Sequence, residues 1–137
     1  MTSVIGKLFV VAVAFCMIGV IEGVDVPDMR FVYGICNNKT YEENSSFDRT
    51  LRDVLYQVKE NTAYNKYDYY NESPWPGPSP IGYGHGRCNS QIRYGYCSEC
   101  LRVAASQILR DCSMRVGAQL QLVDCRIRYE QYEFGET

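Results

Sequence analysis

Two stretches of the chain carry apolar residues at helical spacing. In residues 45–63 the apolar side chains recur at i, i+4, i+7, i+8 and i+11, which places them on one helix face; they are Phe47, Leu51, Val54, Leu55 and Val58. Ser45 followed by Asp48 predicts the helix start, because the hydroxyl can accept a hydrogen bond from a free N–H of the first turn. Residues 97–112 carry a second stripe, formed by Leu101, Ala104, Ala105, Ile108, Leu109 and Cys112.

Strand patterns lie near both ends of the chain. Residues 29–36 are rich in β-forming residues and predict a strand. Near the other end, Leu120 and Leu122 alternate with glutamines, and after Asp124 the alternation continues in the opposite phase. A period of two predicts strands, and the phase shift predicts a bulge or a tight turn near Asp124.

The segment 64–86 is interrupted by proline and glycine. Four prolines alternate between Pro74 and Pro80, and glycines follow at Gly82, Gly84 and Gly86. Since proline lacks an N–H and fixes φ, we predict a long loop here, with room for a short strand near Tyr83. Strands at both ends and two helices between them, without a βαβ rhythm, predict an α+β domain. Its sheet should be antiparallel, with the helices on one face.

The first 23 residues have the features of a secretory signal peptide. Lys7 precedes an apolar run, Leu8 to Val20, that is shorter than the roughly 20 residues a membrane span needs. Ile21 and Gly23 then occupy the −3 and −1 positions of a cleavage site. We therefore expect residues 1–23 to be removed and residues 24–137 to form one exported domain without a membrane anchor. The net charge of −2 gives no argument for binding nucleic acid or anionic membranes.

The cysteines indicate disulfides. Of seven, Cys16 lies in the expected signal peptide, and the even number that remains in a small exported domain predicts three bridges. A zinc site on the C-x2-C pair Cys97 and Cys100 would leave two thiols unpaired in an oxidising compartment, and the only histidine is His85. A thioredoxin-like redox pair would need a βαβ context. The spacing alone does not choose among the fifteen possible pairings.

Other patterns bear on modification and catalysis. Sequons for N-glycosylation begin at Asn38, Asn44 and Asn71, and the last is followed by Pro74, which makes it a poor acceptor. A Ser-His-Asp set would need His85, which lies among glycines, and no pair of carboxylates stands out at glycosidase spacing. We expect neither an enzyme nor a cofactor.

The C-x8-C-x2-C spacing of Cys88, Cys97 and Cys100 resembles that of the ginkbilobin-type domain of land plants. The segments "RTLRDVLYQVKENTA" and "GAQLQLVDCRIRYEQYEF" and the position of Cys36 extend the resemblance from about Met29 to Phe134. That domain also builds the ectodomains of cysteine-rich receptor-like kinases and of plasmodesmal proteins. A single copy without a membrane span is similar to the short secreted antifungal members of the family.

The resemblance implies a fold and a disulfide pattern. The fold is a five-stranded antiparallel sheet with two helices. The implied pairs are Cys36–Cys112, Cys88–Cys97 and Cys100–Cys125.

The resemblance also implies a function: a monomeric, mannose-binding antifungal lectin that acts on glycans of the fungal cell wall. Two of the family's three sugar-contacting residues correspond to Asn37 and Glu130, and the position of the third, an arginine, holds Gln119. An amide keeps a donor but loses the charge. Because charge-assisted hydrogen bonds contribute about 1–2 kcal/mol more than neutral ones, we expect roughly tenfold weaker binding. The alternative is an extracellular interaction module that recognises a receptor or peptide and binds no sugar.

Overall fold

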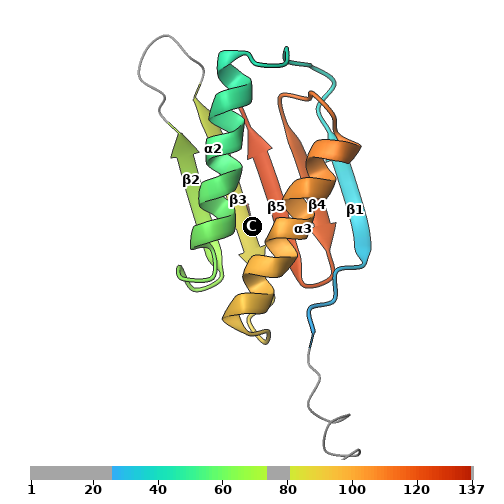
Figure 1. Ribbon diagram of the computed structural model, residues 1–137, viewed down its shortest axis with the longest axis vertical. Coiled ribbons are helices and arrows are strands. Elements are labelled where there is room, and N and C mark those ends of the chain that lie inside the picture. Colours follow the sequence, from blue (N-terminus) through green and yellow to red (C-terminus); the bar gives the residue numbers. More distant parts are fainter. Residues whose placement is uncertain (1–25, 74–80, 137) are drawn as a thin grey trace, which may run out of the picture.

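The computed structural model describes residues 26–73 and 81–136, which form one sheet covered on one face by two helices (Figure 1). The expected signal peptide and the proline-rich residues 74–80 lie outside the described residues. All neighbouring strands are antiparallel, in the order β1-β4-β5-β3-β2. The elements are β1 (Phe31–Cys36), α2 (Ser46–Asn61), β2 (Asp68–Ser73), β3 (Gly82–Cys88), α3 (Tyr94–Asp111), β4 (Ala118–Leu122) and β5 (Cys125–Glu130). The α+β fold with five antiparallel strands and two helices on one face is confirmed.

Helix α2 begins as predicted. Ser45 is the N-cap, and its hydroxyl accepts a hydrogen bond from the Asp48 N–H at 3.3 Å. The Asp48 carboxylate reaches back to the N–H of Asn44 at 2.8 Å, one residue before the cap. The five apolar residues of the predicted stripe are all buried against the sheet and α3. Local capping and the apolar face therefore specify this helix together.

Helix α3 begins at Tyr94, three residues before the predicted start at Cys97. The predicted stripe is buried except for Leu109, which is 37% exposed. Leu109 lies at the edge of the stripe and lines a shallow groove between the helices with Leu55 and Tyr56, so the prediction that it belongs to the core is wrong. Ala104 and Ala105 are buried, in agreement with the close packing that the alanines indicated.

The short strand expected near Tyr83 is confirmed as β3, but the prediction of a loop is wrong for the residues of β2, which pairs with β3 along its length. The three glycines of β3 occupy alternate positions, all facing α2. A Cβ at Gly82 would lie 2.8 Å from Thr50, one at Gly86 would lie 2.5 Å from Val58, and one at Gly84 would overlap Val54. The glycines thus mark the inner face of a strand on which a helix sits unusually close. Their spacing of two residues is therefore typical of a strand, although glycine more often indicates a loop.

The phase shift near Asp124 corresponds to a tight turn at Val123 and Asp124 between β4 and β5, as predicted. The Asp124 carboxylate accepts hydrogen bonds from the Asp28 N–H at 2.6 Å and from the side chain of Asn89 at 2.9 Å. One buried carboxylate therefore holds the β4–β5 turn to the segment before β1 and to the segment after β3.

All six cysteines of the described residues are in disulfides, which settles the role of the C-x2-C pair. Each bridge has one cysteine in α3 or directly after it. The bridges are Cys36–Cys112, Cys88–Cys97 and Cys100–Cys125, the pairs expected from the resemblance. They connect α3 to β1, to the end of β3 and to the start of β5. Within residues 26–73 and 81–136, no helix has the length and apolar character that crossing a membrane requires.

The bridges should differ in their effect on stability, because they close loops of different length. Cys36–Cys112 spans 76 residues and Cys88–Cys97 spans 9. Restriction of the unfolded chain gives about 4.5 kcal/mol for the long loop and about 2.6 kcal/mol for the short one. We predict that replacing Cys36 and Cys112 by serine lowers the free energy of unfolding more than replacing Cys88 and Cys97 does. Chemical denaturation of the two double variants would measure the difference. Equal losses from the two double variants would contradict this ranking.

The close approach of α2 to β3 gives a second prediction. Gly84→Ala should destabilise the fold by about 1–3 kcal/mol, because the new methyl group overlaps Val54. Val54→Ala in the same chain should recover part of the loss by making room. Gly95→Ala, where a Cβ meets nothing within 4 Å, is the matched control and should be neutral or stabilising. Thermal unfolding of the variants would test this, and a neutral Gly84→Ala would contradict it.

Candidate functional site

The sheet face opposite the helices presents polar side chains in three cross-strand rows. Strand register sets each row, because residues of like phase point to the same face. The first row is Asp68, Arg87, Arg126, Gln121 and Tyr33; the second is Tyr70, His85, Arg128, Gln119 and Ile35; the third begins with Glu72, Tyr83 and Glu130. Two of the three residues expected to contact sugar, Gln119 and Glu130, therefore lie on one face in adjacent rows.

Asn37 and Glu130 both contact Gly117, Asn37 through its backbone and Glu130 through its side chain. The Asn37 N–H donates to the Gly117 carbonyl at 2.8 Å. A Cβ on Gly117 would overlap the Glu130 carboxylate, so the carboxylate lies directly against this glycine. Asn37 directly follows β1 and Gly117 directly precedes β4, so the pairing of these strands brings together residues far apart in sequence.

The Asn37 side chain has a fixed orientation. Its Oδ1 accepts a hydrogen bond from the Lys39 N–H at 2.9 Å, which forms an Asx turn. The backbone carbonyl of Asn37 accepts from the Arg115 guanidinium at 2.9 Å. The polar end of this residue is thus positioned before any ligand arrives.

Gln119, at the position where the resemblance places an arginine, has two guanidinium groups beside it. It pairs with Arg128 across β4 and β5, and its Oε1 accepts a hydrogen bond from Arg126 at 2.8 Å. The positive charge that the family pattern places at position 119 is therefore present one side chain away. Arg126 and Arg128 alternate with apolar residues in β5, which places both on this face.

Glu130 is the buried carboxylate of the site, with a side chain 8% exposed. Its Oε1 accepts from the Nε of Arg128 at 3.3 Å, while its Oε2 is buried and has no hydrogen-bond partner among the described residues. Burial raises the pKa of Glu130, and the opposite charge of Arg128 offsets this only in part. A buried acceptor without a donor is costly, and a ligand hydroxyl is the kind of group that would satisfy it.

The segment after β5 folds back over the same face, which the sequence did not predict. The Phe134 ring lies 4.1 Å from the Arg128 guanidinium carbon. The Glu136 carboxylate pairs with Arg126 at 2.7 Å, with Arg128 at 3.5 Å and with His85. His85, expected in a loop, is consequently 1% exposed at the middle of the sheet.

The three sequons differ in accessibility. Asn38 and Asn44 are exposed, whereas Asn71 lies in β2 with its Nδ2 atom buried. Asn38 directly follows Asn37, so a glycan there would stand beside the candidate site. Glycosylation of Asn38 and Asn44 stays a prediction, and the folded chain does not expose the nitrogen of Asn71 that a glycan would need.

The fold places the chain in the class of DUF26-type domains. It is similar to the solved tandem DUF26 ectodomains of two Arabidopsis thaliana cysteine-rich receptor-like proteins, PDLP5 and PDLP8. The TM-scores are 0.70 and 0.71, with 25% and 27% sequence identity over 77% of this chain. The chain spans about half the length of those ectodomain chains, 51% and 50%.

Residues 35–132 match the family model described as salt stress response/antifungal, and the chain belongs to this family. It is 36% identical over 110 residues to antifungal protein ginkbilobin-2 of Ginkgo biloba, covering 80% of this chain and 82% of the relative. It is 36% identical over 119 residues to antifungal protein ginkbilobin-like protein 1 of Picea glauca, covering 84% of both chains. Plasmodesmata-located protein 8 of Arabidopsis thaliana is 30% identical over 107 residues, which are 76% of this chain and 38% of that protein.

The raised pKa of Glu130 predicts how stability changes with pH. The Glu130 carboxyl binds its proton more tightly in the folded state than in the unfolded state. At a pH above its folded-state pKa, the ionised carboxylate therefore lowers the free energy of unfolding. This penalty disappears as the pH falls to the ordinary glutamate pKa of 4.5. Glu130→Gln should therefore be more stable than the wild type at pH 7 and equal to it near pH 3.5. Chemical denaturation at both pH values would measure this.

The control for that experiment is Glu99→Gln. Glu99 lies on the outer side of α3, where a hydrogen bond from Arg102 lowers its pKa. Its ionised form favours folding, so this variant should lose a little stability at pH 7. A Glu130→Gln variant less stable than the wild type at pH 7 would show that the carboxylate is fully satisfied in the free protein.

Proposed function

We propose that this protein is an extracellular antifungal defence protein that binds mannose-containing glycans of fungal cell walls through Asn37, Gln119 and Glu130. The observation that carries the proposal is the buried, unpartnered Oε2 of Glu130 beside Gly117, next to Asn37. Support for the defence role comes from family membership and from relatives named as antifungal proteins. The three disulfides are consistent with an oxidising, extracellular environment.

The site would bind sugar hydroxyls through planar polar groups. Glu130 accepts a hydrogen bond from one hydroxyl at Oε2. The Asn37 amide, held by its Asx turn, and the Gln119 amide, held by Arg126, present groups of fixed orientation to neighbouring hydroxyls. Pre-positioned side chains lose little entropy on binding, which favours recognition of a small ligand.

A second candidate function is an extracellular interaction module that binds a receptor or peptide and no sugar. Edge strand β1 favours it, because Phe31, Val32 and Ile35 are each more than half exposed. Exposed apolar residues on an edge strand are typical of protein-binding surfaces. In this case glycan binding would be absent, and substitutions in β1 would affect the partner while Glu130 would not matter.

Substitution of Gln119 tests the sugar site directly. Gln119→Arg should strengthen mannan binding about tenfold, because a guanidinium adds charge-assisted donors to sugar oxygens. Glu130→Ala should abolish binding, since a sugar hydroxyl would lose its acceptor. Retention on immobilised mannan and calorimetric titration with mannotriose would measure both effects.

The matched control is Gln121→Arg, which places the same new charge on β4 in the first row, opposite Arg126. It should leave mannan binding unchanged. If Gln119→Arg gives no gain and Glu130→Ala no loss, the interaction-module function becomes the better proposal.

A further inference from the structure

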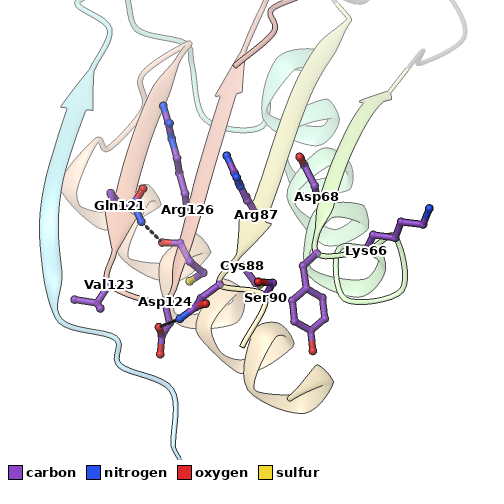
Figure 2. Close-up of a pocket in the computed structure, with 12 residues that line it drawn as sticks. Lys66, Asp68, Arg87, Cys88, Ser90, Gln121, Val123, Asp124 and Arg126 are labelled. Carbon is purple, nitrogen blue, oxygen red and sulfur yellow. Dashed lines mark hydrogen bonds between the residues drawn. The ribbon is translucent and has the colours of Figure 1, made fainter. Parts of the chain in front are cut away.

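Cations gather at one end of the exposed sheet face. A hollow of about 470 Å³ opens there, and Figure 2 shows Arg87 and Arg126 projecting in the same direction from β3 and β5 along it. Lys66 lines its other side. Arg87 and Arg126 are direct cross-strand partners in the first row. Like charges in such positions destabilise a sheet unless an anion lies between or above them.

The acids around the hollow are engaged elsewhere. Asp68 pairs with His85 at 2.5 Å, and Asp124 accepts from the segments before β1 and after β3. Among the described residues Arg87 forms no ion pair, and the Nε of Arg126 is buried without a hydrogen-bond partner. The guanidinium groups of Arg87 and Arg126 therefore have N–H donors that are not all used by other described residues.

The segment after β5 already places a carboxylate on one of these cations, Arg126. The side chain of Glu136 is 7% exposed, with its carboxylate on Arg126 at 2.7 Å and beside Arg128 and His85. Its backbone N–H donates to the Tyr70 hydroxyl at 2.8 Å. A carboxylate can thus be bound on this face, and Glu136 stands in for that of an external ligand.

The carboxylate-binding groups are continuous with the proposed sugar-binding groups. Arg126 donates to Gln119 at 2.8 Å, and Arg128 donates to Glu130 at 3.3 Å. The inner strands β3, β4 and β5 have a hydrogen-bonded strand on each side, so a peptide backbone would find few partners on this face. Side chains that bind hydroxyls beside side chains that bind a carboxylate match a sugar acid better than a peptide.

We propose that Arg87 and Arg126 bind the carboxylates of a uronic-acid-containing glycan, and that Glu136 competes for the same site. This deepens the proposed glycan binding and rests on it only for the contacts to hydroxyl groups. A tethered group acts at an effective concentration on the order of millimolar, so Glu136 weakens the binding of any external carboxylate. Displacing Glu136 opens the cradle formed by Arg126, Arg128 and His85.

The test is calorimetric titration of the whole protein with trigalacturonate. Arg87→Gln should weaken binding about tenfold, because Arg87 carries a charge and does not touch Glu136. Glu136→Gln should strengthen binding several-fold, because it removes the competitor. Arg102→Gln, on the outer side of α3, is the control and should change nothing. Binding should also weaken as salt rises from about 20 to about 150 mM.

Two further ligands separate the outcomes. Mannotriose reports the proposed neutral-sugar site, and the pentapeptide Tyr-Glu-Phe-Gly-Glu, the sequence of residues 132–136, reports peptide binding. The first outcome is that mannotriose binds, Glu130→Ala abolishes that binding, and trigalacturonate does not bind even to Glu136→Gln. This result would overturn the inference and leave the proposed function standing. Trigalacturonate binding that depends on Arg87, without mannotriose binding, would support the inference and overturn the mannose proposal. Arg87-dependent binding of the pentapeptide alone would overturn the inference in favour of a peptide ligand.

Discussion

Helix α3 is covalently tied to three of the five strands, because every disulfide of the described residues has one cysteine in this helix or directly after it and the other in β1, β3 or β5. Strand β1 depends on this most, since it pairs on one side only and most of its side chains are exposed. The Cys36–Cys112 bridge holds its end against the helix, and Asn37 is the next residue along the chain. The position of a candidate ligand residue is therefore set by a covalent bond to the opposite face of the sheet.

The exposed face combines charges of both signs that are only partly neutralised. His85 lies between the carboxylates of Asp68 and Glu136. Arg128 lies between those of Glu130 and Glu136. The Nε atom of Arg126 is buried and has no hydrogen-bond partner among the described residues. Charged groups withdrawn from water stabilise a fold only when their pairing is nearly complete. The incomplete pairing on this face therefore contributes little to the stability of the domain.

The sequence predicted the elements whose apolar residues form a continuous face. Both helices and strands β1, β4 and β5 were found in this way. Strand β2 was missed, and β3 was expected only as a short strand near Tyr83, because the inner positions of β3 are glycines and its packing is supplied by Val54 and Val58 of α2. The resemblance pointed to Asn37 and Glu130. Their meeting at Gly117 depends on strand order and register, and the contact between His85 and Glu136 joins residues 51 apart along the chain. Such long-range contacts leave no periodic pattern in a single sequence.

The separation of the two sheet faces has a consequence for how members of this family can diverge. In β4 and β5 the buried residues that build the core alternate with residues that face outward, and most of the outward residues are partly exposed. A gene duplicate could therefore exchange one outward side chain at a time while the core of the domain stays unchanged. Ligand preference on such a scaffold can drift gradually, and relatives with nearly superimposable backbones can recognise chemically unrelated molecules.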